Sequence, residues 1–485
     1  MPYNIAMVSD NFFPQPGGVE SHMYQLASKL IDRGHKVIII THAYPGRTGV
    51  RYLTNGIKTY HVPFWTIYRE TTFPTVFSFF PIFRNIVIRE RIEIVHGHAS
   101  LSNLCHEAIL HARTMGMRTV FTDHSLFGFG EAGSILTNKL LKFTLSDVDH
   151  CICVSHTCKE NCVLRASLDP SMVSVIPNAV VADNFRPLSQ NEIDSRRTSA
   201  PGPPQPLGPN GTITIVVISR LFYNKGIDLL IAAIPRILAT QPNVRFIVAG
   251  SGPKAIDFEQ MVERNVLQDR VTLLGPVRHD EVRDVMVQGH IYLNPSLMEA
   301  FGTVIVEAAS CGLYVVCTRV GGVPEVLPSH MTEFAAPEED DLVAATNRAI
   351  AKLRSGKVRT DLFHNQVKQM YSWTDVAQRT ERVYDSISTT RSFALIDRLK
   401  RYYGCGIWAG KLFCMCAVVD YLLFIILEIF APRERIDICK DWPKKAVVVG
   451  KQNKEGGENA KDGAGVGKKR SSRQRRESRL DMDES

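Results

Sequence analysis

The chain has 485 residues, of which 45% are hydrophobic and 22% charged, and this size favours two or three folding units. The formal net charge is +8, but residues 444–485 hold twelve Lys or Arg against seven Asp or Glu. The other 443 residues therefore carry only +3, which argues against a nucleic-acid-binding surface.

The N-terminal residues form no basic region followed by a long apolar run, so no secretory signal is expected there. Eleven cysteines are scattered along the chain, as is typical of reduced, buried thiols rather than of a disulfide framework. We therefore expect the main domains to face the cytosol.

Short apolar segments rich in β-branched residues alternate with helical patterns in the first part of the chain. The helical patterns cover residues 20–33 and 101–114. The expected strands are 5–8, 37–41, 92–96, 119–121 and 150–154. This alternation predicts a parallel sheet with crossover helices over residues 1–186.

Residues 187–211 are rich in Pro, Gly, Ser and Gln and show no periodicity, which indicates a linker or a surface insertion. The alternation resumes beyond them, with expected strands at 213–218, 245–249, 271–274, 291–294 and 314–317. The fold class is therefore α/β, with two Rossmann-like domains (1–186 and 212–390) and a ligand in the cleft beyond their strands.

Residues 407–430 are strongly apolar and long enough to cross a bilayer. They contain Asp420 near the centre and Glu428 near the end, and a central carboxyl costs about 2.5–3.5 kcal/mol on insertion scales. A membrane helix is favoured over a core helix of a soluble domain. Basic residues flank both ends, so orientation is left open, and the tail 444–485 is expected to be disordered.

One group of metal-ligand residue types lies at 150–162. Its members are His150, Cys151, Cys153, His156, Cys158 and Cys162. No pair has the spacing of a zinc ribbon, so buried thiols are the favoured interpretation and no metal site is predicted.

A glycine loop with Gly17 and Gly18 follows the first expected strand and opens a helix, where backbone amides can approach a phosphate. By itself this is a weak signal, because an ordinary glycine turn looks the same. In the second domain Arg220 ends a strand and Lys225 precedes the next helix. Two cations at that edge suit a diphosphate leaving group.

Further polar loops follow the later strands of the second domain. Gly250 lies in a Gly-Ser-Gly turn that lacks the third glycine of a dinucleotide fingerprint, and Val277 lies in a second loop at 275–278. A third loop begins at 294 and runs to Glu299. Glu307 lies eight residues later.

A loop followed by a helix would separate the tasks of the two glutamates. Glu299 could then face a sugar, the amides of residues 301–303 a phosphate, and Glu307 the two hydroxyls of a ribose. His124 follows a strand of the first domain and so should face the same cleft. A lone histidine is more often structural, and its role depends on the resemblance described next.

These motifs resemble those of the family 4 retaining glycosyltransferases of GT-B fold, over about residues 3–390. The matches are the glutamate pair, the Arg-x4-Lys-Gly segment, the Gly-Gly-Val-Glu loop and the segment 320–325. The resemblance implies that His124 contacts the donor sugar and that Glu299 lies against it; these are the two expected catalytic residues. It implies donor binding by Gly17, Gly18, Arg220, Lys225, Gly250, Val277, Phe301, Gly302, Thr303 and Glu307. It also implies a metal-independent reaction without a cofactor, in which the leaving phosphate helps to take the acceptor proton.

Within that family, residues 121–129, 136–140 and 173–179 and the apolar segment after 407 resemble the catalytic subunits that begin glycosylphosphatidylinositol (GPI) anchor synthesis. The resemblance implies UDP-N-acetylglucosamine as donor, phosphatidylinositol as acceptor, and partner subunits in a complex. It places the chain in the endoplasmic reticulum membrane as a single-pass protein with its catalytic domains on the cytoplasmic side. Residues 187–211 and the basic tail depart from the pattern.

An aromatic and basic stretch at 64–91 has two interpretations that the sequence does not separate. Arg84, Arg89 and Arg91 follow a run of phenylalanines at 73–83, a mixture that suits an anionic membrane surface. A buried helix beside a solvated basic turn would give the same pattern. Two other functions also stay open: a transferase of this fold with a different lipid or a soluble acceptor, and a non-catalytic scaffold.

Overall fold

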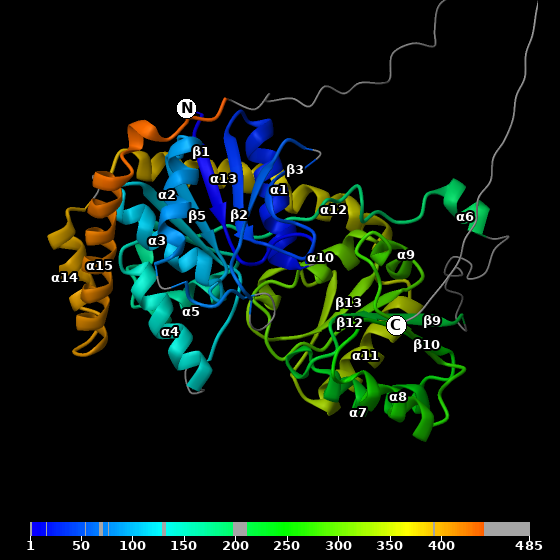
Figure 1. The fold of residues 1–485 in the computed structure, drawn as a ribbon. Helices are drawn as coiled ribbons and strands as arrows, with labels where there is room; N and C mark the ends of the chain where they lie inside the picture. Colours follow the sequence, from blue (N-terminus) through cyan, green and yellow to red (C-terminus); the bar gives the residue numbers. More distant parts are fainter. Residues whose placement is uncertain are drawn as a thin grey trace, which may run out of the picture. The chain divides into compact units, whose positions relative to one another are not determined.

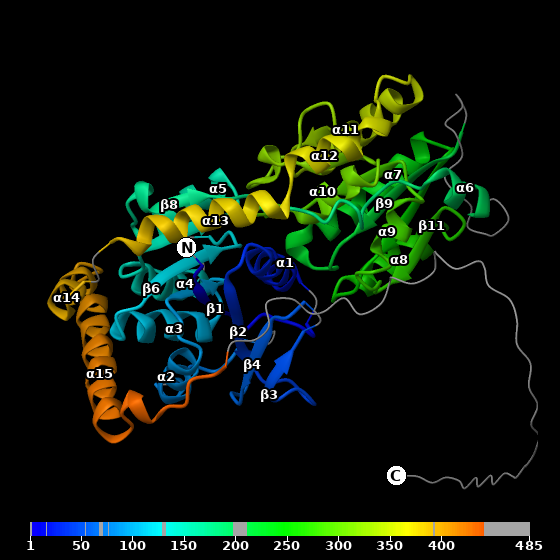
Figure 2. The same ribbon diagram turned by 90° about the horizontal axis from the view of Figure 1, so that it is seen from above.

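The computed structural model describes residues 2–440 except 16, 54, 67–70, 76, 129–131, 197–210 and 391–392. Two parallel α/β sheets carry the chain, and Figures 1 and 2 show them with their helices. We call each sheet, with the helices packed on it, the first lobe and the second lobe. The tail expected to be disordered, 444–485, lies outside the described residues.

The first lobe is built on an eight-stranded sheet of order β3-β4-β2-β1-β5-β6-β7-β8, in which only β3 runs antiparallel to its neighbour. Its strands are β1 Asn4–Val8, β2 Lys36–His42, β3 Gly49–Tyr52, β4 Lys58–Val62, β5 Ile94–His98, β6 Arg118–Asp123, β7 His150–Cys153 and β8 Val173–Val175. Its helices are α1 Gly18–Asp32, α2 Phe79–Arg89, α3 Asn103–Thr114, α4 Ala132–Leu145 and α5 His156–Ala166.

Side-chain alternation along β1 explains why helices cover both faces of this sheet. Ile5 and Met7 join the apolar cluster of α1, whereas Ala6 and Val8 join the cluster of α2 and α3. Successive side chains of a strand point to opposite faces, so an apolar strand needs a cover on each side.

The second lobe has a six-stranded sheet of order β11-β10-β9-β12-β13-β14, with every pairing parallel. Its strands are β9 Ile213–Ile218, β10 Val244–Ala249, β11 Val271–Gly275, β12 Ile291–Asn294, β13 Tyr314–Thr318 and β14 Thr332–Ala335. Its helices are α7 Ile227–Thr240, α8 Ala255–Arg264, α9 Val282–Met286, α10 Thr303–Ser310, α11 Glu339–Arg354 and α12 Phe363–Met370.

Helix α13 (Trp373–Ser388) returns to the first lobe, although the predicted second domain, 212–390, includes it. Val383, Tyr384 and Ile387 share an apolar cluster with Ile5, and the Tyr384 hydroxyl lies 2.7 Å from His96 Nδ1. An amphipathic pattern shows that one face of a helix is buried but not which sheet buries it.

A short helix, α6 (Gln190–Arg196), lies inside the predicted linker 187–211. Ser189 and Glu192 form a reciprocal cap at its start: the Ser189 amide donates to the Glu192 carboxylate over 2.8 Å. The spacing Ser-x-x-Glu is the sequence sign of such a capping box, and the compositional argument passed over it. Arg283 of α9 donates to Glu192 over 3.1 Å and ties the helix to the second lobe.

Helices α14 (Leu395–Tyr403) and α15 (Ala409–Phe430) end the described chain and lie against the first lobe beside α3 and α4 (Figures 1 and 2). The apolar C-terminal helix predicted from the sequence is therefore present. Among the described residues it is the one helix long and apolar enough, by length and composition, to cross a membrane.

The aromatic and basic stretch forms a buried helix in its second part. Phe79, Phe80 and Phe83 of α2 have no exposed surface, and Arg84 is buried and paired with Glu428 of α15. Trp65 and Phe73, which precede the helix, are exposed.

Candidate active site

The predicted site residues follow the carboxyl ends of strands in both lobes. His98 ends β5, and His124 follows β6 in the first lobe. Arg220 follows β9, and Gly250 follows β10 in the second. The carboxyl ends of parallel strands lie at one edge of a sheet, so each lobe gathers its polar loops along one edge.

The lobes touch at this edge through polar contacts made by two loops of the second lobe. The Ser155 hydroxyl donates to the Ala300 carbonyl over 2.7 Å. The Glu325 carboxylate accepts from the amides of His156 (2.6 Å) and Thr157 (2.9 Å) at the start of α5. A carboxylate there satisfies amides that a helix leaves unpaired and favours the helix dipole.

Lys225 and Glu299 form an ion pair at the second-lobe edge, with both side chains about one-fifth exposed (20% and 19%). Lys225 ends a 3-10 turn, and the following Gly226, at φ +68°, would place a Cβ 1.9 Å from the Pro295 carbonyl. Glycine at 226 therefore lets the Lys225 turn lie directly on the loop that carries Glu299.

The loop before α10 leaves the helix N-terminus without a side-chain cap. Gly302 takes the N-cap position at φ +84°, where a Cβ would contact Glu299 Cγ at 3.2 Å, and no side chain accepts from the first amides. Phe301 is buried and packs edge-on against Tyr371, with ring centroids 5.7 Å apart. The amides from Thr303 onward thus form an unoccupied anion site held by a packed loop.

Glu307, on the second turn of α10, is 7% exposed, and burial raises the pKa of its carboxyl to about 8. Within the described part of the chain it has neither an ion pair nor a hydrogen bond to its carboxylate. A buried carboxyl without a partner is unfavourable, so a ligand with hydroxyl donors would relieve it.

Arg220 of the second lobe faces Glu20 of the first. Burial raises the pKa of Glu20, and the charge of Arg220 opposes that rise. Gly17 and Gly18 precede Glu20 at the start of α1, whose N-cap makes no side-chain hydrogen bond. A Cβ on Gly18 would meet no atom within 4 Å, so there is space beside this helix terminus.

Gly250 and Val277 have packing roles in the structure. Gly250 lies at φ +143°, where a Cβ would come 1.8 Å from the Ser219 carbonyl, so glycine permits β9 and β10 to end side by side. Val277 is half-buried and packs against the second-lobe core. Whether either also touches a donor stays a prediction.

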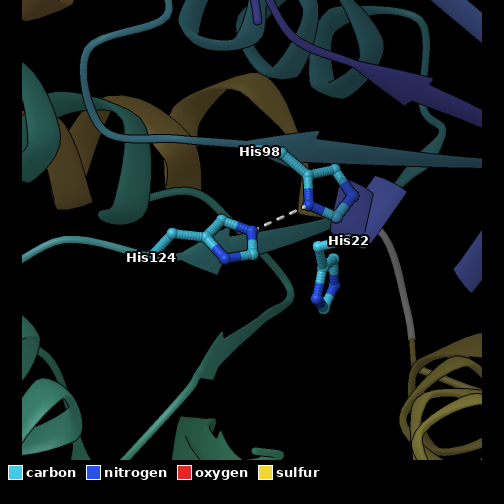
Figure 3. Close-up of side chains that lie close together, drawn as sticks. All are labelled: His22, His98 and His124. Carbon is cyan, nitrogen blue, oxygen red and sulfur yellow. Dashed lines mark hydrogen bonds between the residues drawn. The ribbon is translucent and has the colours of Figure 1, made fainter. Parts of the chain in front are cut away.

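His124 belongs to a cluster of three histidines, shown in Figure 3. His124 Nε2 lies 3.3 Å from His98 Nδ1, and the ring of His22 lies with its centroid 4.6 Å from that of His124. Burial lowers the pKa of His22 to about 4 and holds those of His98 and His124 well below their usual value. The three rings are therefore neutral at physiological pH.

The sequence argument found His124 but missed His22 and His98. His98 follows the same rule as His124, since it ends the neighbouring strand: Thr122 of β6 pairs with His98 of β5. His22 lies on α1 close after the glycine loop, and Asn178 fixes its ring through a 2.8 Å contact to Nδ1. Strand ends were identifiable in the sequence, but the approach of α1 to them was not.

Two groups in the described residues could hold a metal ion: His22 with His98 and His124, and Cys151 with Cys153 and Cys162. In the first, neutral rings with nitrogens within 4.8 Å of one another meet the chemical needs of a transition metal. In the second, contacts among the thiols and burial raise the pKa of Cys153 well above its usual value, which disfavours the thiolate ligand. The expected absence of a metal stays a prediction.

A hollow of about 770 Å³ lies behind the contact between Ser155 and the 300-loop. Phe301 and Glu325 line it, together with Lys159 and Arg382, but His124, Glu299 and Glu307 do not. The side chains expected to meet the donor thus lie outside this hollow.

The arrangement defines a glycosyltransferase of GT-B fold. Residues 212–355 match the family described as glycosyl transferases group 1. Sucrose-phosphate synthase from Thermosynechococcus elongatus shares the fold at a TM-score of 0.65 and 21% identity, over 79% of this chain and 99% of that one. Anabaena HepE in complex with UDP shares it at 0.61 and 18%, over 79% and 100%. The predicted fold class is confirmed.

Residues 42–131 match the family described as PIGA (GPI anchor biosynthesis). The gpi3 subunit of phosphatidylinositol N-acetylglucosaminyltransferase from Schizosaccharomyces pombe is 66% identical over 92% of this chain and 94% of its own length. The corresponding subunit of the human enzyme is 49% identical over 94% and 92%. The chain belongs to this family of phosphatidylinositol N-acetylglucosaminyltransferase subunits, as the sequence motifs indicated.

Proposed function

We propose that the chain transfers N-acetylglucosamine from UDP-N-acetylglucosamine to the inositol of phosphatidylinositol, the first step of GPI-anchor biosynthesis. The observation that carries this proposal is the buried, unpartnered Glu307 on the same short helix whose uncapped N-terminus follows Glu299. A nucleotide sugar offers a ribose diol, a diphosphate and a sugar, which are the three groups this segment is chemically ready to bind.

In this proposal Glu307 accepts hydrogen bonds from the ribose hydroxyls. Arg220 and Lys225, with the first amides of α10, hold the diphosphate and stabilise the charge that grows on it as the glycosidic bond breaks. Lys225 is paired with Glu299 in the structure, so the diphosphate would take over part of its charge and leave Glu299 to the sugar. These cations supply the stabilisation that a metal ion provides elsewhere, which supports a metal-independent reaction.

His124 would meet the donor sugar from the first lobe as a neutral imidazole, held by His98 and His22. Retention of configuration fits a front-face transfer in which the leaving phosphate helps to take the acceptor proton. The carboxylate of Glu299 is already engaged by Lys225 and Ser296, which does not favour a nucleophilic role for it.

The relatives are named as subunits, so we propose that this chain also works with partner subunits in a membrane-bound complex. We place it at the endoplasmic reticulum membrane with both lobes on the cytoplasmic side. The exposed apolar side chains of α15 support attachment to a membrane.

The test is an assay in microsomes that carry this chain in place of the resident subunit, supplied with labelled UDP-N-acetylglucosamine or UDP-glucose. We expect label from UDP-N-acetylglucosamine alone in a lipid that phosphatidylinositol-specific phospholipase cleaves, joined in the α configuration. Label in sterol or polyprenyl lipids instead would favour the alternative transferase. Transfer that survives loss of both Glu299 and Glu307 would favour the scaffold.

A further inference from the structure

Helix α15 presents two different faces along its whole length. Gly410, Ala417 and Asp420 are buried, and Phe424 and Leu427 pack against the first-lobe core. The opposite side is exposed and apolar, and we call it the outer stripe. The outer stripe consists of Trp408 (82% exposed), Leu412, Met415, Leu422, Ile426 and Phe430 (77% exposed). Its members recur every three or four residues, so they share one side of the helix.

Both carboxylates of α15 are bound by side chains of the first lobe. Asp420 Oδ1 lies 2.6 Å from His111 Nδ1, and the Thr114 hydroxyl donates to Oδ2, with Asp420 and His111 fully buried. Arg84 Nη2 donates to Glu428 Oε1 over 2.8 Å. We call these contacts the polar latch. They hold α15 along α2 and α3, where both views place it (Figures 1 and 2).

The segments before and after α15 are both attached to the first lobe. Before it, Arg398 of α14 donates to Asp147 over 2.6 Å. After it, the Cys439 amide donates to the Arg89 carbonyl over 2.9 Å, and Lys58 Nζ lies 3.6 Å from Cys439 Sγ. A helix of 22 residues is about 33 Å long, close to the thickness of the hydrocarbon core. If α15 crossed that core, residues 398 and 439 would lie on opposite sides of the membrane and could not both contact one lobe.

A crossing would also separate Asp420 from His111 and leave its carboxyl near the centre of the bilayer, an unfavourable position. The polar latch and the spanning orientation are therefore mutually exclusive, unless the lobe itself enters the membrane. Lobe side chains such as Lys58 and Glu90, which pair beside Cys439, make that entry unfavourable.

We propose that α15 lies flat on the membrane, with the polar latch on the lobe side and the outer stripe in the acyl boundary of the cytoplasmic leaflet, and that it does not span. Interfacial helices bury an apolar face in this way and carry aromatic and cationic residues at their margins. Here Lys411 lies over the Trp408 ring at one end, and Arg433 and Arg435 follow the other. The proposal rests on the membrane attachment in the proposed function and replaces the single-pass topology that the apolar sequence suggested.

Topology is tested with Lys461→Thr, which creates an Asn-Ala-Thr glycosylation site in the tail of the full chain. In microsomes we expect no glycan at Asn459, because the tail stays on the cytoplasmic side. The same tail fused to a secreted carrier should be glycosylated, which shows that the site is competent. A glycan on the tail of the full chain would overturn the proposal. N-acetylglucosamine transfer in the same microsomes is a separate outcome, so a failed topology and a failed function are distinguishable.

The membrane face is tested by flotation of the purified full chain with phosphatidylcholine–phosphatidylinositol vesicles. We expect Leu422→Glu with Ile426→Glu to reduce binding by about tenfold or more, since both side chains enter the acyl boundary. Ile256→Glu with Leu362→Glu, a matched pair of exposed apolar residues on the second lobe, should leave binding unchanged. Equal vesicle binding by both pairs, or no binding by the wild type, would overturn the proposal; the second result would indicate a protein partner on the outer stripe.

Discussion

The two lobes treat buried charge in opposite ways. In the first lobe buried charges are paired: Asp420 with His111, Asp147 with Arg398, and Asp123 with Arg165. In the second lobe Glu307 is equally buried but has no partner in the described residues, and burial raises its pKa to about 8. Paired charges fix helices to a core, whereas an unpaired carboxyl is retained at a cost in stability for a ligand.

The largest effect should come from breaking a paired charge of the first lobe. Asp420→Ala leaves His111 buried without its partner, and removing one member of a buried pair costs about 3–5 kcal/mol. Glu428→Ala removes a partly exposed carboxylate and should cost about 1 kcal/mol or less. The measurement is denaturant unfolding of the two variants, and equal stability of both would show that the latch does not hold α15.

A smaller effect in free energy, but a large one in rate, is expected from Glu299→Gln. The variant keeps the size of the side chain but loses the charge beside Lys225, so kcat should fall by about 10²- to 10³-fold while the melting temperature is kept. Lys368→Ala, which removes an exposed ion pair with Asp183, serves as the control and should transfer normally. Normal kcat in Glu299→Gln would remove Glu299 from the catalytic residues.

Glu307 should make UDP binding depend on pH. Its pKa of about 8 means that the free protein holds a proton there, and two ribose hydroxyls favour the ionised form. Binding then releases the proton, so UDP affinity should rise toward pH 8, by at most about tenfold per pH unit, and level off above it. Calorimetry should show this rise in the wild type and a flat profile in Glu307→Gln.

The same residue predicts the sign of a stability effect. The folded pKa, about 8, lies above the ordinary value of 4.5, so the folded state holds more protons between these values and is destabilised as pH rises through that window. Glu307→Gln removes this term and should be at least as stable as the wild type at pH 8. Marked destabilisation of Glu307→Gln would instead place Glu307 with the paired, structural charges of the first lobe.

The smallest effect should come from the contact that joins the lobes. Glu325→Gln removes a negative charge from the start of α5 and should cost about 0.3–1 kcal/mol at low salt, and less at high salt. Glu338→Gln, at the start of α11, makes no side-chain cap and is the matched control. A loss in Glu325→Gln that does not change with salt would indicate lost hydrogen bonding rather than lost charge.

The sequence predicts the two sheets well because parallel strands buried on both faces are continuous apolar runs. It misses β3, β4, β8 and β14, which lie toward the sheet edges, where β3 is fully exposed and β8 has three residues. It also assigns α13 to the wrong lobe and overlooks α6, because the partner of an amphipathic helix and a local cap are not compositional properties.

For the site, the sequence identifies Lys225, Glu299 and His124 because each follows the carboxyl end of a strand. It does not indicate that Lys225 and Glu299 pair, that Glu307 lacks a partner, or that His22 and His98 surround His124. These features depend on the approach of separate loops and lobes. For the same reason the apolar pattern of residues 407–430 could not show that both carboxylates of the helix are bound by the first lobe.

The central claim, that Glu307 is kept unpaired for the ribose of a uridine nucleotide, is tested most directly by comparing UDP with 2′-deoxy-UDP. Calorimetric affinities of both should be measured for the wild type and for Glu307→Ala. We predict that the wild type prefers UDP by about tenfold or more, since a charged acceptor loses one hydroxyl partner, and that Glu307→Ala shows no preference. The same preference for UDP in both proteins would contradict the account.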